Sequence, residues 1–436
     1  MSHHEPTTAV VPVTALDIAR AGTTTHGTFG PLDITADQLQ RRMEKLATAA
    51  PATRLQARPR LDSTRWEHDP TLLREAVLAA PAGTAWTPAG LTAHREHERS
   101  AAPPIATVLH DQHMLVEFDH GLGDQNFLVN LSSALTSPAG APLPEWFSTA
   151  SVRAPLARAI ARTFGTSPQR SLEFLARRRD QNSIPAEAPA TPSRTGEGSP
   201  VPWAPSYAVA YSRGTKQAWD EVEAWRRSFA SPPSMAAINM AVLTLALQEA
   251  GIEVSPTYHM LFDARRYLRP TDHVTQNFAS GVDLRIPGTL TPQRLHRAIM
   301  SAVTTGAPLT SLAATKLMVA RRLRRGEPIP HPLDHTDRPA RPIARLAFTD
   351  GGRPPQIAAM PWAAGPDERH CIVACTPGGP DWITLATSRV DKRFHFTASY
   401  YDNVFPRERV EAAVIAATTE PVALLDRHAA ITQEEA

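Results

Sequence analysis

The sequence predicts an α/β protein in which helices pack against mixed sheets. In both halves of the chain, short segments with the alternating apolar spacing of strands are interleaved with segments of helical spacing. Such alternation is typical of layered α/β bodies. The length of 436 residues is enough for two or three domains, and 42% hydrophobic against 20% charged residues is ordinary globular usage. These proportions argue against a disordered chain and against a coiled coil.

In the first half, a turn is expected between a strand and a helix. The capping-box pattern Thr35–Gln38 and the apolar residues after it predict a helix over 36–50. Residues 113–118 alternate like a strand, and residues 126–135 return to helical spacing. Residues 119–125 (DHGLGDQ) therefore form a glycine-containing turn from strand to helix.

The second half repeats this alternation. An apolar run predicts a buried helix over 234–250 that ends at Gly251, followed by a strand over 256–262 and a charged turn over 263–266. Near the end of the chain, two adjacent strands and a helix are expected at 382–388, 393–400 and 408–417.

Proline-rich segments divide the chain. Residues 181–205 mix Pro, Ser, Gly and Thr with almost no apolar periodicity, which predicts a linker between an N-terminal lobe, 1–180, and a C-terminal lobe, 206–436. A second proline-rich segment, 326–342, is expected to be a long loop within the C-terminal lobe.

Charge and cysteine content give no sign of a nucleic-acid, membrane or metal partner. The 45 Lys and Arg against 43 Asp and Glu leave a net charge of +2, so we expect neither a nucleic-acid nor a membrane partner. Cys371 and Cys375 cannot supply a disulfide scaffold or a four-thiolate zinc site, and we expect free thiols and no metal. With no signal-peptide pattern and no spanning apolar run, a cytoplasmic location is expected.

His120 is the candidate for chemistry. A histidine at the start of a glycine turn can present its imidazole to a cleft, and its usual pKa near 6.5 suits proton transfer at neutral pH. The His-x-x-x-Asp spacing of His120 and Asp124 is weak evidence alone, because His259 and Asp263 share it, although His259 falls within a predicted strand. From these residues alone, both a catalytic and a structural role for His120 remain open. GxSxG, HExxH and Walker A motifs are absent.

Two motifs together resemble a known superfamily. The segment Phe118–Asp124 (FDHGLGD), between a strand and a helix, is similar to the HxxxD turn of the chloramphenicol-acetyltransferase-like acyltransferases. That superfamily includes nonribosomal-peptide condensation domains and polyketide-associated acyltransferases. Far along the chain, Phe262–Leu268 (FDARRYL) followed by residues 276–278 (QNF) resembles the family's DxRRxL segment and asparagine turn. Looser similarity extends to the N-terminus, to residues 348–352 and to the closing SYYDNVF.

The resemblance implies two chloramphenicol-acetyltransferase-like lobes, each a mixed sheet packed with helices, with the active site at the lobe interface. It implies that His120 is a general base and that Asp124 supports the site by pairing with an arginine, for which we predict Arg265. Gly121 and Gly123 would shape the turn. Further contacts to substrate or site are expected from four residues: Asp119, Gln125, Asn277 and Asp350.

This chain departs from the family pattern at three places. Asp119 stands where condensation domains usually carry a second histidine, Gln125 follows the aspartate where glycine is usual, and Gln276 precedes Asn277 where glycine is also usual. Either altered chemistry or loss of turnover could accompany such changes.

The resulting hypothesis is a stand-alone acyltransferase, functioning as a monomer in specialised metabolism. It would move an acyl group from a coenzyme A or phosphopantetheinyl carrier-protein thioester, used as cosubstrate without a bound cofactor, to a small alcohol or amine. Two alternatives stay open: a catalytically silent binding protein of the same fold, and a condensation enzyme that joins two carrier-bound partners.

Overall fold

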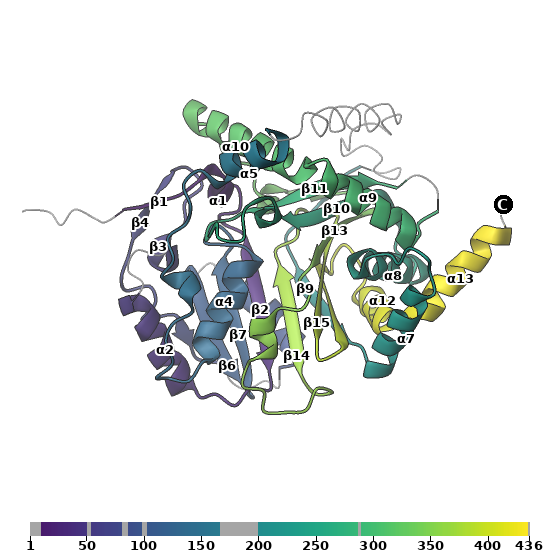
Figure 1. Cartoon of the computed structure of the whole chain (residues 1–436), viewed down its shortest axis with the longest axis horizontal. Helices are drawn as coiled ribbons and strands as arrows, with labels where there is room; N and C mark the ends of the chain where they lie inside the picture. The colour runs from purple at the N-terminus through teal and green to yellow at the C-terminus, as the bar shows by residue number, and fades with distance from the viewer. Residues whose placement is uncertain are drawn as a thin grey trace, which may run out of the picture.

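The computed structural model describes residues 10–49, 54–80, 86–97, 103–165, 199–286 and 289–434, and the chain forms two α/β lobes. In Figure 1 most elements of the first lobe are purple or blue and most of the second are teal, green or yellow, while the light-green β14 lies in the first lobe's sheet. Each lobe is built on one large sheet with helices packed against it, so the predicted fold class is confirmed.

The first lobe contains a five-stranded sheet in which only the last pair of strands is parallel. Across the sheet the strands are β14 (His370–Cys375), β2 (Thr24–Gly30), β7 (His113–Asp119), β6 (Ile105–His110) and β5 (Val77–Leu78). Its helices are α2 (Ala36–Ala49), α3 (Pro88–His97) and α4 (Gln125–Thr136). A small sheet beside it joins β1 (Val10–Pro12), β4 (Arg65–His68) and β3 (Ala57–Arg58).

The second lobe contains a six-stranded mixed sheet, in which β10–β13 and β13–β15 are parallel pairs and the other pairs are antiparallel. Its order is β11 (Ala279–Arg285), β10 (Val254–Asp263), β13 (Ala344–Asp350), β15 (Trp382–Val390), β16 (Arg393–Tyr401) and β9 (Tyr207–Arg213). Its helices are α7 (Lys216–Arg227), α8 (Met235–Glu249), α9 (Pro292–Thr304), α12 (Arg407–Thr419) and α13 (Pro421–Glu434).

Three helices lie over the junction of the lobes, at the top of Figure 1. They are α1 (Ala15–Ile18), α5 (Pro155–Phe164) and α10 (Ala307–Arg325). Helix α10 contacts both α1 and α5 and also packs on β11, so it joins segments from both halves of the sequence.

Most expected elements are found close to their expected bounds. Helix α2 spans Ala36–Ala49, and residue 50 lies outside the described part. The predicted strands are confirmed at 254–263, 382–390 and 393–401. Helix α8 is buried on nearly all sides, with Ser234 as its N-cap. One boundary was wrong: Gln125, expected in the turn, is the first residue of α4, because Asp124 caps that helix.

The expected linker lies outside the described residues as far as residue 198. Its last part forms strand β8 (Val201–Pro202), which pairs with β12 (Asp337–Arg338) from the second proline-rich segment. The remaining short elements are α11 (Pro355–Ala358) and the 3-10 turns Arg54–Gln56, Glu145–Phe147, Ala264–Tyr267 and Pro332–Asp334.

Strand β14 is where the lobes are joined. It belongs to the second half of the sequence, yet it pairs with β2 along its whole length in the first lobe's sheet (Figure 1). Because side chains of a strand alternate between its faces, Cys371 packs into the first core while Ile372 and Ala374 pack into the second. Both cysteines are free thiols.

Within the described ranges, no helix has the length and apolar character needed to span a membrane.

We predict that Ile372→Ala lowers the free energy of unfolding by about 2–5 kcal/mol, because the Ile372 side chain is 0% exposed and its removal leaves a cavity. Urea denaturation followed by tryptophan fluorescence measures the change. Ile415→Ala, at a site 51% exposed on α12, is the control and should change the stability by less than about 0.5 kcal/mol. Equal effects of the two substitutions would contradict a buried role for β14.

Candidate active site

The turn between β7 and α4 is held by hydrogen bonds that involve Asp119 and the backbone of His120. Asp119, at the end of β7, accepts hydrogen bonds from the backbone N–H groups of Gly22 at 2.9 Å and Gly121 at 2.8 Å. The backbone N–H of His120 donates to the carbonyl of Thr23 at 2.8 Å. The segment after α1 is thereby fixed against the turn that carries His120.

The two glycines of the turn are required by close packing. A Cβ on Gly121 would lie 2.8 Å from the ring of Trp66 and 3.0 Å from the Cα of Ala21. A Cβ on Gly123 would lie 2.3 Å from the Cβ of Phe127. Real Cβ atoms do not approach other atoms so closely, so any larger residue would displace the turn.

The tautomer of His120 follows from its hydrogen bond. Its Nδ1 lies 2.9 Å from the carbonyl oxygen of Gly123, and a carbonyl can only accept, so Nδ1 carries the proton. Nε2 then holds the lone pair and makes no hydrogen bond within the described residues. The imidazole is therefore arranged to accept a proton at Nε2.

Burial and a nearby cation keep this imidazole neutral. Burial is the larger effect and the Arg20 guanidinium the second, and together they lower the pKa of His120 to about 4. Both effects disfavour the charged imidazolium. At neutral pH the side chain is a neutral base.

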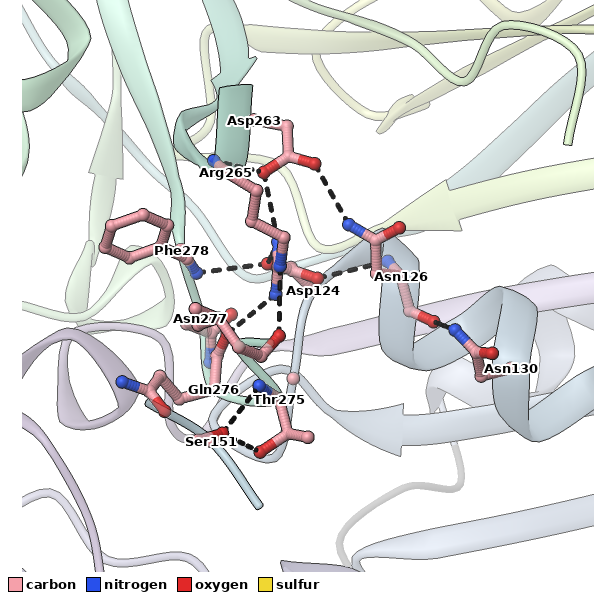
Figure 2. Close-up of polar contacts among 12 residues, drawn as sticks. Asp124, Asn126, Asn130, Ser151, Asp263, Arg265, Thr275, Gln276, Asn277 and Phe278 are labelled. Atoms are coloured by element: carbon pink, nitrogen blue, oxygen red, sulfur yellow. Dashed lines mark hydrogen bonds and ion pairs between the residues drawn. The ribbon is translucent and has the colours of Figure 1, made fainter. Parts of the chain in front are cut away.

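Asp124 and Arg265 form an ion pair between the lobes. Nη1 of Arg265, which follows β10, lies 2.7 Å from Oδ2 of Asp124, the N-cap of α4 (Figure 2). The same oxygen accepts from the backbone N–H of Phe278 at 3.0 Å, and Oδ1 accepts from that of Asn126 at 3.1 Å. The carboxylate of Asp124 makes no hydrogen bond to His120, so it supports the turn rather than the imidazole directly.

Arg265 also donates hydrogen bonds to backbone carbonyls of its own lobe. Its Nε donates to the carbonyl of Val274 at 3.0 Å, and its Nη2 donates to that of Gln276 at 2.9 Å (Figure 2). A second carboxylate, Asp263, lies 3.1 Å from Nη1. The guanidinium thus fixes residues 274–276 next to the ion pair.

The ion pair shifts the pKa values of both partners. Burial alone would raise the pKa of Asp124, but the charge and hydrogen bond of Arg265 outweigh it and the pKa falls below its usual value. Burial would lower the pKa of Arg265, and the facing carboxylates of Asp124 and Asp263 raise it instead. Both groups are charged at neutral pH, as a buried pair with further hydrogen bonds requires.

Asn277 ties the second lobe to the turn of His120. Its side-chain amide donates to the carbonyls of His120 at 2.8 Å and Gly121 at 3.2 Å. Its backbone N–H donates to Oδ1 of Asp17 at 3.1 Å. Asp17 is fully buried in α1 and pairs with Arg54 at 2.5 Å. Within the described residues, Gln276 takes part only through its carbonyl, which any residue would supply.

The remaining predicted contact residues form a separate group at the end of β13. Asp350 pairs with Arg389 at 3.0 Å and accepts from the hydroxyl of Thr387 at 3.1 Å. Gln125 reaches this group, since a Cβ on Gly351 would lie 2.3 Å from its Nε2. The carboxylates of two predicted contact residues, Asp350 and Asp119, thus accept hydrogen bonds from groups of this chain.

The structure brings together His120, Asp124, Arg265, Asn277 and the two glycines, and it adds two residues that the motifs did not reveal. Asp17 and Arg20 lie before residues 32–56, the N-terminal stretch in which the looser resemblance begins. Neither belongs to a pattern that sequence spacing could connect with His120. Among the described residues, no cluster of three or more metal-ligating side chains is present.

No family model and no curated protein sequence matches the chain, whereas solved structures match over almost its entire length. The trichothecene 15-O-acetyltransferase of Fusarium sporotrichioides is 12% identical, with a TM-score of 0.60, over 96% of this chain and 95% of that one. The epimerization domain of tyrocidine synthetase B is 11% identical, with a TM-score of 0.53, over 100% and 99%. Polyketide synthase associated protein 5 of Mycobacterium tuberculosis is 14% identical, with a TM-score of 0.52, over 96% and 99%. These neighbours show that the chain has the two-lobed chloramphenicol-acetyltransferase-like fold shared by acyltransferases and condensation-type domains.

We predict that Asp124→Ala lowers the free energy of unfolding by about 3–5 kcal/mol, because it leaves the Arg265 guanidinium buried without its main partner. The double variant Asp124→Ala/Arg265→Met should be less destabilised than the sum of the two single variants. Urea denaturation of the four proteins measures the coupling.

A surface pair provides the control for this cycle. Asp220 pairs with Lys216 on α7, where the two side chains are 53% and 56% exposed. Asp220→Ala should cost less than about 1 kcal/mol. Additive effects at Asp124 and Arg265 would show that the two residues do not act as a pair.

Proposed function

We propose that this protein is an acyltransferase that moves an acyl group from a coenzyme A or carrier-protein thioester to a small alcohol or amine. The observation that carries the proposal is the state of His120: a neutral imidazole with its proton held on Nδ1 by Gly123, leaving Nε2 as a base. The fold shared with an acetyltransferase and with synthetase domains supports it.

The proposed reaction needs one base and an activated donor. Nε2 of His120 takes the proton of the acceptor hydroxyl or amine as that group attacks the thioester carbonyl carbon. The tetrahedral intermediate collapses by breaking the carbon–sulfur bond, and the imidazolium returns the proton to the leaving thiolate. The products are an ester or amide and a free thiol. Because the thioester supplies the activation, the proposal includes no bound cofactor.

Asp124 and Asn277 serve as positioning residues in this proposal. The ion pair of Asp124 with Arg265 and the amide of Asn277 fix the backbone on both sides of His120. A base that is already held in the reactive orientation does not have to lose conformational entropy to reach it in each turnover.

We predict that His120→Ala lowers acceptor-dependent thiol release by about 10²–10⁴-fold, the usual contribution of a general base. The assay presents acyl-coenzyme A and acyl-carrier thioesters, with and without a pool of alcohols and amines, and follows thiol release. Dependence on the carrier form of the donor distinguishes the carrier-linked reaction from coenzyme A chemistry.

The matched control is His68→Ala. His68 lies on β4 and hydrogen-bonds to Gln56 at 3.0 Å, and no hydrogen bond among the described residues joins it to the turn, so this variant should keep wild-type activity. Transfer at the wild-type rate in His120→Ala would refute the general-base role. If the wild type binds thioesters and consumes none with any acceptor, the protein is a binding member of its fold.

The pH dependence of the reaction should reflect the lowered pKa of His120. The base is lost on protonation, so kcat/KM should hold from neutral pH down to about 5 and fall as the pH approaches 4. A pH–rate profile, with circular dichroism to verify folding at each pH, tests this. A decline centred on the ordinary histidine pKa near 6.5 would contradict the desolvated environment described here.

A further inference from the structure

Arg20 lies beside the candidate base without belonging to the network that holds it. It follows α1, and the residues after it are fixed to the histidine turn by the bonds from Gly22 to Asp119 and from His120 to Thr23. Its charge is the second cause of the lowered pKa of His120. The guanidinium is therefore close to the imidazole and is held there by the backbone.

The guanidinium of Arg20 has no partner in the part of the chain that the structure describes. No hydrogen bond or ion pair forms to it there, and its nitrogens are not among the fully enclosed polar atoms. The two nearby carboxylates are already used: Asp17 binds Asn277 and Arg54, and Asp119 binds two backbone N–H groups. Arg20 thus has donors to offer to a bound group.

Its environment makes an unpaired state costly. Burial lowers the pKa of Arg20, and the only opposing influence is the thiol of Cys375, a group that is itself neutral because burial raises its pKa to about 11. Arg20 is half-buried, and a cation partly withdrawn from water without a facing anion loses solvation that no group of the described residues repays. An anion supplied from outside the chain would offset this cost.

A small cavity lies beside Arg20 at the junction of the lobes. Its volume is about 110 Å³, and it is bounded by α1, β11 and α10. Its polar lining includes Arg20, Asn277, Ser280, Ser311 and Thr315. Since Asn277 bonds to the carbonyl of His120 at 2.8 Å, the cavity is next to the turn that carries the base. Whole-ligand pockets usually measure about 300–1,000 Å³, so this one accommodates only the end of a ligand.

We propose that Arg20 binds a carboxylate of the acyl acceptor, which makes the acceptor an amino acid or a hydroxy acid. A planar guanidinium matches a carboxylate with two parallel hydrogen bonds, and the hydroxyl of Thr315 in the cavity lining can supply a third. The acceptor is the substrate that gives its proton to His120, so its carboxylate would be anchored within the same site as its reacting group. This inference rests on the proposed function.

The test compares acids with neutral analogues of the same shape. Leucine is paired with leucinamide, and 3-hydroxybutyrate with its methyl ester, in the thiol-release assay. For the wild type, the KM of each acid should be about 10- to 100-fold below that of its neutral partner, the range of a charge-assisted hydrogen bond. Arg20→Gln should remove this difference between acids and neutral analogues, and Arg20→Lys should keep part of it.

Arg41→Gln is the control, since Arg41 on α2 lines a separate cavity of the first lobe. It should leave the preference for acids intact. Equal KM values for acids and neutral analogues in the wild type would overturn the inference, and so would a preference that survives in Arg20→Gln. Comparing succinyl-coenzyme A with butyryl-coenzyme A tests whether Arg20 binds a carboxylate of the donor. If the Arg20-dependent preference for acids appeared only among the donors, the inference that Arg20 binds the acceptor would be overturned.

A binding measurement separates this inference from the proposed function. The acids, and not their neutral partners, should raise the Tm of the wild type and not that of Arg20→Gln. If this holds in a protein that consumes no thioester, the proposed function fails and the carboxylate site stands. If acyl transfer depends on His120 while acids and neutral analogues behave alike, the carboxylate site alone fails.

Discussion

The buried ion pair of Asp124 and Arg265 is the contact on which the rest of the site depends. One carboxylate caps α4, holds the guanidinium from the other lobe at 2.7 Å and accepts the backbone N–H of Phe278. The guanidinium in turn binds the carbonyls of Val274 and Gln276. Because the Asp124 carboxylate accepts three hydrogen bonds and the Arg265 guanidinium donates four, the desolvation cost of burying two charges is offset, and the geometry on either side of Asp124 is fixed.

Strand β14 and Asn277 extend this constraint to the whole junction. The strand pairs with β2 in the first sheet while its alternate faces pack into the two cores, so the lobes cannot separate without breaking a sheet. Asn277 adds hydrogen bonds from the second lobe to the backbone of His120. His120 is thus positioned by both lobes, which explains why a site at their interface can be rigid although it is built from distant segments.

Electrostatics at the junction favour a neutral imidazole and leave one cation without an anion. Asp124 is paired with Arg265, and Asp17 and Asp119 are occupied by other groups, so no carboxylate neutralises Arg20 in the described residues. In the proposed carboxylate site, the same charge that lowers the basicity of His120 would attract an anionic substrate. Once such an anion binds, its charge would raise the pKa of His120 toward the range in which a base acts at neutral pH.

The sequence by itself determined the local elements and the residues that repeat a family motif. Periodicity located α2, β7 and α8, because burial of one face imposes a fixed spacing, and the motif pair indicated that Asp124 and Arg265 belong together. Only the tertiary structure placed β14 in the first sheet, engaged Asp119 and Asp350 with their own chain, and brought Asp17 and Arg20 to the turn of His120. The spacing of apolar residues indicates which face of a local helix or strand is buried. Contacts between segments hundreds of residues apart depend on how two sheets pack, and a single sequence carries no period that encodes this.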